Sequence, residues 1–328
     1  MNPRERLRCV FSHQTPDRLP MVEWATWWDK TLIRWYGEGA PVCSGLELRN
    51  WFGQDAWQQM WISSSTDDLP EPAAHGAPLI TNMAEYKEIK RFLYPDVDLT
   101  SFRAAKPAHE AGELGVWFTF EGFFWFPRGL LGIEPHLTSF YDEPELYHTI
   151  CADLLAWQQR TLDAILSVLT PDFMTFGEDM SYNLGPMIGK HIFDEFLAPY
   201  YRVIVPMLKS AGISVILDSD GDITSCLGWY LDVGMDGILP LERQAGVDVM
   251  RLQDEHPGVI LIGAFDKMVM PHGEAAMRAE FERLLPAMRR GGFIPSVDHQ
   301  TPPGVSLSQY QTYMALLNEY VRKAVEPT

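Results

Sequence analysis

One stretch of the chain decides the fold: Ser214-Val215-Ile216-Leu217-Asp218-Ser219-Asp220-Gly221-Asp222. Its first four residues form a short apolar run of the kind that makes a buried parallel strand. The run ends abruptly in carboxylates and a glycine. In α/β folds, the segments that follow strand ends carry the ligands and the chemistry. The stretch therefore predicts a strand followed by a functional site.

The acidic part of this stretch indicates the kind of site. Asp218 and Asp220 are two residues apart, so in extended backbone their side chains point the same way. Two acidic groups on one side repel each other unless a cation or a shared proton holds them. The pair therefore predicts a metal site or an acid–base site. The alternative is an aspartate-rich turn in which Asp222 caps the following helix.

The same pattern recurs along the second half of the chain. Strand patterns end near residues 176, 217, 239, 262 and 295 and alternate with helix patterns over about 142–169, 190–211, 273–289 and 306–324. Alternation predicts parallel strands joined by right-handed crossovers. An acid follows each strand, and a closed barrel would bring these acids to one mouth, whereas an open sheet would spread them along an edge. We therefore predict an α/β fold, a (β/α)8 TIM-type barrel.

The N-terminal part has a weaker pattern. An opening helix is expected over residues 3–11 and a first barrel strand over Met21–Trp24, whereas residues 30–115 are rich in Pro and Trp and are expected to be irregular. One large barrel can absorb 328 residues, so length gives no reason to divide the chain. The prediction is a single domain over 1–328, with about 30–115 as an elaboration over one end.

Composition excludes several classes of protein. The chain is 46% hydrophobic and 21% charged, an ordinary globular composition. A net charge of −18 argues against nucleic acid, which requires clustered Lys and Arg. No apolar run approaches the roughly 18 residues of a membrane span, and no signal sequence is evident. Four cysteines without a CxxC pair are expected to be reduced thiols, so we predict a cytoplasmic protein that binds neither nucleic acid nor a membrane.

Further residues are candidates for substrate contacts. Trp24, Trp28, Phe124 and Trp125 belong to dense aromatic segments that would suit an aromatic ring or a methylated cation, although core packing explains them equally well. Arg128 suits a substrate carboxylate, because a planar guanidinium binds that group bidentately. The remaining candidates are carboxylates and a phenol at strand ends: Glu178 as an extra metal ligand or base, and Glu242, Asp266 and Tyr182 as substrate contacts.

Four stretches together resemble the uroporphyrinogen decarboxylase superfamily, and its methyltransferase-like branch more closely than the true decarboxylases. The opening runs from Arg4-Glu5-Arg6-Leu7 to Pro16-Asp17-Arg18-Leu19-Pro20. The second stretch is Gly177-Glu178-Asp179-Met180 with Gly185-Pro186-Met187-Ile188, and the third is Val215–Asp222, where relatives often carry His-Ser-Cys-Gly-Asn. Gly263-Ala264-Phe265-Asp266-Lys267 and Gly291-Gly292-Phe293-Ile294, with Pro302-Pro303, complete the match.

The resemblance implies a barrel with its site at the C-terminal mouth and, in the zinc-dependent methyltransferases, a zinc ion held by a His, a Cys two residues later and a distant Cys. Carried over, those positions are Asp218, Asp220 and His299, none of which keeps the family's residue type. Two carboxylates and an imidazole form a harder ligand set, suited to zinc, manganese or iron and to an oxygen-bearing substrate. Alternatively, the metal has been lost and His299 acts as a general acid oriented by Asp298 or Asp218.

By resemblance, the leading expectation is a methyltransferase component that activates a small O- or N-methylated substrate for transfer to a corrinoid on a partner protein. The alternative is a non-porphyrin decarboxylase or lyase that uses Arg128 or Lys267. A third is a ligand-binding protein without catalysis. Uroporphyrinogen itself is not expected as the substrate, because Glu23–Lys30 contains no arginine where true decarboxylases grip acidic side groups. Divalent zinc is the expected metal, and a homodimer is compatible with this expectation.

Overall fold

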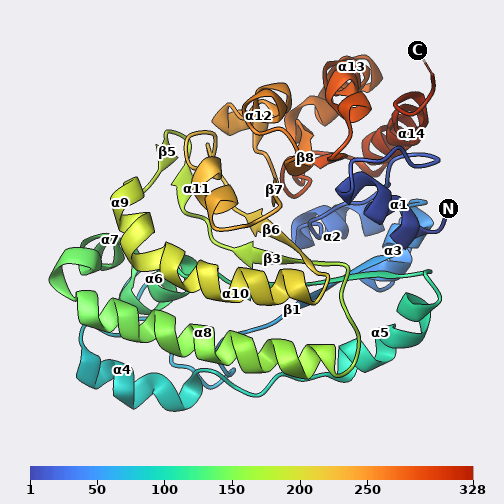
Figure 1. Cartoon of the computed structure of the whole chain (residues 1–328). Coiled ribbons are helices and arrows are strands. Elements are labelled where there is room, and N and C mark those ends of the chain that lie inside the picture. The colour runs from blue at the N-terminus through green and yellow to red at the C-terminus, as the bar shows by residue number, and fades with distance from the viewer. Residues whose placement is uncertain (328) are drawn as a thin grey trace.

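Seven parallel strands form the sheet at the centre of the molecule (Figure 1). The structure is a computed structural model that describes residues 1–327. The strands are β1 (Trp57–Trp61), β2 (Gly115–Glu121), β3 (Phe173–Gly177), β6 (Ser214–Asp218), β7 (Gly237–Leu239), β8 (Ile260–Phe265) and β9 (Phe293–Val297). They pair in the order β1-β2-β3-β6-β7-β8-β9, which is also their order along the chain. This order is that of a TIM-like barrel, in which each strand pairs with the next one in sequence.

Three central strands end level with one another. Gly177 of β3 pairs with Asp218 of β6, which pairs with Leu239 of β7. The loops after these strands therefore begin at the same height. The acids predicted after strands β3, β6 and β7 consequently share one end of the sheet.

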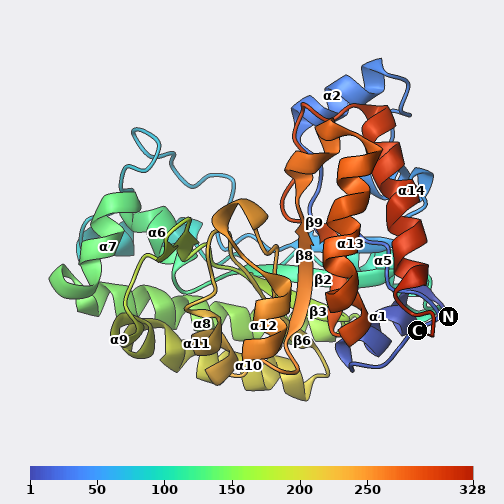
Figure 2. The same ribbon diagram turned by 90° about the horizontal axis from the view of Figure 1, so that it is seen from above.

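Helices cover the outside of the sheet, as the alternating pattern predicts. The long predicted helices are confirmed as α8 (Pro144–Leu166), a helical run from α9 (Lys190–Ile192) through the π-helical η2 (Phe193–Leu197) to α10 (Ala198–Ser210), and then α13 (Glu274–Arg290) and α14 (Leu307–Lys323). Shorter elements complete the connections: α11 (Leu227–Asp232), η3 (Arg243–Ala245), α12 (Val249–Glu255) and η4 (Lys267–His272). Figures 1 and 2 show α8 and α10 lying side by side against the strands.

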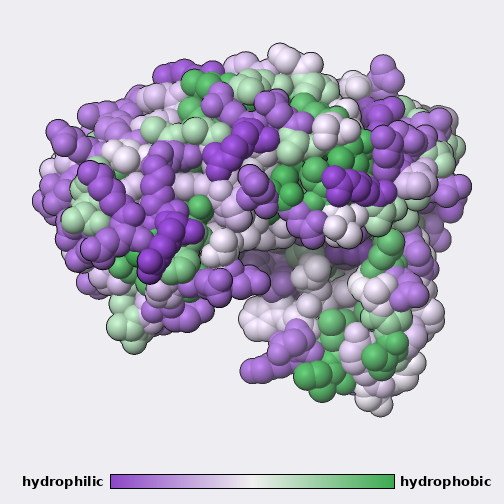
Figure 3. Space-filling model, turned by 90° about the horizontal axis from the view of Figure 1, so that it is seen from below, coloured by the Kyte–Doolittle hydropathy of each residue, from purple (hydrophilic) through white to green (hydrophobic). Residues whose placement is uncertain are grey.

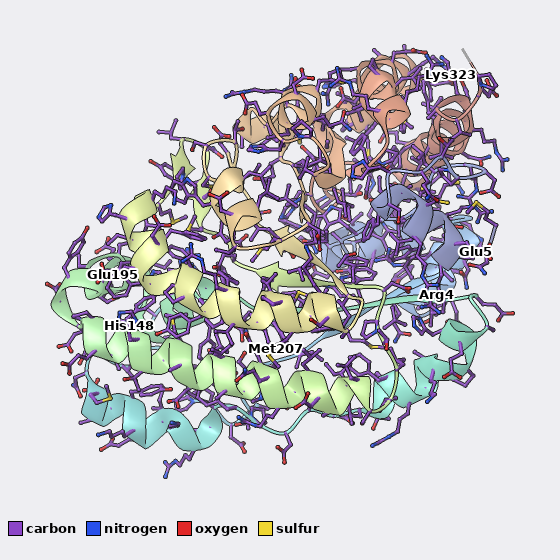
Figure 4. The ribbon with its side chains drawn as sticks, in the orientation of Figure 1. Arg4, Glu5, His148, Glu195, Met207 and Lys323 are labelled. Carbon is purple, nitrogen blue, oxygen red and sulfur yellow. The ribbon has the colours of Figure 1, made fainter. Side chains whose placement is uncertain are left out.

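Aromatic stacking fixes the helices of this layer to one another. The ring of His148 in α8, labelled in Figure 4, stacks on Phe196 of η2 with ring centroids 4.6 Å apart. Its Nδ1 atom lies 2.9 Å from the hydroxyl of Tyr200 in α10. Neighbouring helices are thus joined by a polar contact as well as by apolar burial.

The predicted first strand is absent, and this prediction was wrong. Residues Met21–Trp24 run extended, but they form no ladder with either edge strand. They still contact both edges, since Met21 O accepts from Asp55 N just before β1 and Trp24 Nε1 donates to Val297 O at the end of β9. The segment therefore lies between the two edge strands, which do not pair with each other within residues 1–327.

The region from 30 to 115 is more regular than its sequence suggests, which corrects a second prediction. It contains β1 and the helices α2 (Asp29–Gly37), α3 (Gly45–Trp51), α4 (Met83–Ile89), η1 (Lys90–Phe92) and α5 (Thr100–Glu110). The predicted opening helix is confirmed as α1 (Pro3–Phe11), capped by Asn2. Arg4 of α1, labelled in Figure 4, donates from Nε to Asp172 at 2.8 Å, directly before β3. This ion pair anchors α1 at the N-terminal ends of the strands.

A hairpin and two helices lie at the opposite end. A short hairpin, β4 (Ser181–Tyr182) and β5 (Gly185–Pro186), follows β3, and α6 (Trp125–Leu131) and α7 (Ile133–Asp142) follow β2. Figure 2 shows these elements on one side of the strands' C-terminal ends and α2 on the other. Figure 3 shows that the surface between these two sides is deeply hollowed. Within residues 1–327, no helix is both long enough and apolar enough to cross a membrane.

Candidate functional site

Three ligand-type side chains converge at the C-terminal end of the sheet. Asp220, Glu242 and His299 follow β6, β7 and β9, and each offers a ligand atom within 4.8 Å of the other two. We call these three residues the mouth cluster. The imidazole Nε2 of His299 lies 3.4 Å from a carboxylate oxygen of Asp220. All three side chains are partly exposed, so a ligand can reach them from solvent.

A glycine turn sets the position of Glu242 relative to Asp220. The backbone N–H of Gly221 donates to Glu242 Oε2 at 3.0 Å. Gly221 has φ +82°, and a Cβ atom there would lie 2.7 Å from the backbone nitrogen of Tyr182. Only glycine combines this left-handed conformation with such close passage of the hairpin strand. The turn thereby holds the loop after β6 to the loop after β7.

Asp179 supports the cluster from behind, and the sequence reasoning missed this role. Its Oδ1 atom accepts the backbone N–H of Asp220 at 3.0 Å. Burial and the charge of Asp220 raise the pKa of Asp179 to about 6. Its backbone has φ +34°, which few non-glycine residues adopt. Leu241 and Ala264 share a positive φ at the ends of β7 and β8, and strain of this kind gathers at functional sites.

The electrostatics of the cluster call for a positive charge. Among residues 1–327, no Lys or Arg forms an ion pair with Asp220 or Glu242, and His299 is the only basic partner of Asp220. The hydrogen bond to Asp220, followed by its charge, raises the pKa of His299. Trp24 packs edge-on against the imidazole with ring centroids 6.1 Å apart. The cluster can thus bind a cation or hold a proton on His299.

Asp218 takes a different place from the one predicted. It lies at the end of β6 and does not belong to the mouth cluster, in which Glu242 supplies the second carboxylate. Burial, and then the charges of Asp179 and Asp220, raise the pKa of Asp218 well above its usual value. The prediction relied on extended backbone through residue 220, but the chain turns after β6. The structure thus brings Asp220 and His299 together without Asp218.

Glu178, predicted as a base or extra ligand, is completely enclosed. Its carboxylate accepts the backbone N–H groups of Phe124 and Trp125 and the hydroxyl of Tyr201. Burial raises its pKa to about 8. The structure therefore places Glu178 as an anchor for the start of α6 and leaves it no route to a ligand.

The other carboxylates at the strand ends fix loops. Asp266 accepts from Met268 N and from Gln244 Nε2, so it caps η4. Asp298 is fully buried and accepts from Lys267 Nζ at 3.1 Å and from two backbone N–H groups. The predicted pairing of His299 with Asp298 is therefore replaced by a pairing with Asp220. Lys267, a candidate cation for a lyase, already forms an ion pair with Asp298.

The predicted aromatic contacts divide between core and mouth. Phe124 is fully buried against His136 and cannot touch a substrate in this conformation. Trp28, directly before α2, is 43% exposed, and Tyr182, on the hairpin, is 48% exposed. Trp125 is partly buried, and the guanidinium of Arg128 lies 4.8 Å from the centre of its ring. Within residues 1–327, the guanidinium of Arg128 has no ion-pair or hydrogen-bond partner.

The fold and the mouth cluster together define an α/β protein with a barrel-ordered parallel sheet and a candidate cation site at its C-terminal end. A family model described as uroporphyrinogen decarboxylase (URO-D) matches residues 129–320, which is more than half of the chain. The chain therefore belongs to the uroporphyrinogen decarboxylase family. No curated protein sequence matches it significantly.

Solved structures have only weak similarity to this chain. A B12-independent methionine synthase from Shewanella sp. W3-18-1, in complex with selenomethionine, has a TM-score of 0.43 and 12% identity, over 70% of this chain and 67% of its own. A putative B12-independent methionine synthase from Listeria monocytogenes has a TM-score of 0.38 and 15% identity, over 70% of each chain. A cyclic maltosyl-maltose hydrolase from Arthrobacter globiformis also has a TM-score of 0.38, with 9% identity, over 84% and 82%.

Proposed function

We propose that this protein is a metal-dependent methyltransferase component that acts on a small O- or N-methylated substrate. The observation that carries the proposal is the mouth cluster: two carboxylates and one imidazole on three separate loops, with no Lys or Arg to neutralise the acids among residues 1–327. Such a set suits a divalent cation, with zinc first among the candidates. The fold is taken to act as a (β/α)8 barrel, with residues 21–24 in place of the first strand.

The ligand set fits a cation for chemical as well as geometric reasons. Asp220, Glu242 and His299 supply two oxygens and one nitrogen, and three protein ligands leave coordination positions open. When bound, a divalent cation supplies a Lewis acid for a substrate oxygen or nitrogen. Gly221 and Asp179 orient the loops that carry the ligands. Thiol activation, which would favour thiolate ligands, is less suited to this set.

The acceptor of the methyl group is proposed to be a corrinoid on a separate protein. This part rests on the resemblance to the methyltransferase-like branch, and the hollowed surface around the strand ends gives a partner room to approach (Figure 3). The methyl group leaves the substrate oxygen or nitrogen, which retains the bonding electron pair and takes a proton from solvent, and it joins the acceptor, which must be the reduced cob(I) form because it supplies the electron pair of the new bond. A homodimer remains compatible with this arrangement.

The test is methyl transfer to free cob(I)alamin, followed by absorbance, with methylated phenols, ethers and amines as donors and zinc or manganese supplied. We expect activity that requires the cation and falls at least about tenfold in H299A and in D220N, because each change removes one ligand. D163N, on the exposed side of α8, is the matched control and should behave as the unaltered protein. Unchanged transfer in both ligand variants would refute the proposal.

A second candidate function is a non-porphyrin decarboxylase or lyase of the same family. The observation in its favour is Arg128, which is half-buried and has no carboxylate partner among residues 1–327. A free guanidinium is suited to a substrate carboxylate. Carbon dioxide release without methyl transfer, lost in R128Q but retained in H299A, would favour this function over the first.

A further inference from the structure

A pocket lies beside the mouth, between α6 and the loop that precedes α4. Its volume is about 180 Å³, and its lining is mostly apolar. Trp125, Arg128, Gly129 and Ile133 line one side, and His75 and Gly76 line the other. The two sides belong to segments about fifty residues apart in the chain, so the pocket forms only in the folded protein.

Backbone contacts hold the two sides together. Ile133 N donates to Gly76 O at 3.0 Å, and Leu79 N donates to Leu130 O at 2.8 Å. A Cβ atom at Gly132, where φ is +80°, would lie 2.7 Å from the backbone nitrogen of Pro78. The loop therefore approaches the helices as closely as glycine permits. The pocket is a built feature of the fold and not a gap between loose segments.

Arg128 is the only Lys, Arg, Asp or Glu among the residues that line this pocket. Its side chain lies over the ring of Trp125 and forms no ion pair in the described part of the chain. Trp125, which lines the pocket, donates its backbone N–H to Glu178 directly after β3, and the next residue, Asp179, accepts the backbone N–H of Asp220 in the mouth cluster. The pocket therefore adjoins the candidate metal site.

We propose that this pocket is the substrate subsite, and that it takes a single-ring carboxylic acid whose carboxylate binds Arg128. The volume is suited to one ring, since an apolar cavity of about 150 Å³ binds benzene. It is small beside the roughly 300–1,000 Å³ of typical ligand pockets, which excludes a tetrapyrrole from this subsite. The half-buried guanidinium of Arg128, which lies over the ring of Trp125, can bind a carboxylate bidentately. The inference rests on the proposed function for the reaction, but ligand binding at the pocket can be measured without it.

Calorimetric titration of metal-free, chelator-treated protein tests the subsite. The probes are benzoate, 4-methoxybenzoate and methoxybenzene, the last of which has the ring but no carboxylate. We expect R128Q to bind the two acids at least about tenfold more weakly, because it removes the charge-assisted hydrogen bonds to the carboxylate, and to bind methoxybenzene unchanged. R202Q, at an exposed position in α10, is the matched control and should bind all three normally.

A second variant tests the pocket itself. Gly129 lines it, and a Cβ atom there would meet no atom within 4 Å, so G129L should fill the space without straining α6. We expect G129L to weaken all three probes at least about tenfold, whereas G45L, at an equally open helical glycine, leaves them unchanged. If R128Q does not fold, R128K replaces it and should lose part of the carboxylate affinity.

The outcomes separate this inference from the proposed function. Unaltered binding of the acids in R128Q, unaltered binding in G129L, or no binding of any probe to the unaltered protein would each overturn the subsite. Zinc binding is measured on the same preparations. Probe binding without zinc binding would sink the metal-dependent function and leave the subsite standing, and the reverse result would do the opposite.

Discussion

The acids Glu178 and Asp220 follow neighbouring parallel strands, yet they occupy opposite environments. Glu178 is fully buried, and three donors from the protein contact the oxygens of its carboxyl group. Asp220 is partly exposed, and its nearest partners are another carboxylate and an imidazole. Glu178 therefore stabilises the fold, whereas the negative charge of Asp220 destabilises the folded state until a cation binds. An acidic strand end is therefore not enough to identify a functional residue, because its partners decide the role.

Removing Glu178 should have the largest effect on stability. E178A leaves two backbone N–H groups and a tyrosine hydroxyl without acceptors in a buried site, so we expect a loss of about 3 kcal/mol in the free energy of unfolding. Denaturant titration measures it. E178Q keeps an acceptor oxygen and should lose less. Equal, small losses in both variants would show that the enclosed carboxylate is not an anchor.

The raised pKa of Glu178 should also make the stability of the protein depend on pH. The pKa of Glu178 is about 8 in the folded protein, above the usual 4.5, so the folded state holds this proton more tightly than the unfolded state. The contribution of protonated Glu178 to the free energy of unfolding is complete below pH 4.5 and is lost as the pH rises toward 8. Relative to the unaltered protein, E178Q should gain stability over that window by up to about 1.4 kcal/mol per pH unit. Parallel pH profiles would contradict the buried, protonated state.

Neutralising Asp220 should have the smallest effect, and with the opposite sign. In metal-free protein, D220N removes repulsion with Asp179 and Asp218, so we expect a change within about 1 kcal/mol and toward higher stability. Adding zinc should stabilise the unaltered protein and not D220N, because a ligand that binds only the folded state raises its stability. A thermal denaturation series with and without zinc measures both effects. If D220N destabilised the protein more than E178A does, Asp220 and not Glu178 would be the acid that anchors the fold.

The C-terminal half of the fold was predictable because its strands are buried on both faces. The runs at 214–218 and 260–265 are almost continuously apolar, which is typical of a parallel sheet. The strand at Trp57–Trp61 escaped notice because Gln58 and Gln59 interrupt the apolar pattern at a sheet edge. Conversely, Met21–Trp24 has a strand-like pattern, but the Glu23 carboxylate accepts from Ser296 and Val297, so side-chain contacts replace a ladder.

The site was predictable only in part, for reasons of local backbone geometry. Two-residue spacing suggested that Asp218 and Asp220 act together, but the glycine turn at 221 directs Asp220 toward Glu242. Sequence spacing carries no signal for that turn's partner, which follows a different strand. Glu178 and Asp179 are adjacent, and only their burial and their hydrogen-bond partners distinguish the anchor from the residue that supports the mouth cluster. The pocket beside Arg128 depends on a long-range contact that no local pattern reveals.

The most direct test of a cation site built by the mouth cluster is anomalous diffraction from crystals grown with zinc. We predict one strong peak per chain, within coordination distance of Asp220, Glu242 and His299, which disappears in H299A and persists in D218N. A map without a peak among these three side chains, or a peak that survives in H299A, would contradict it.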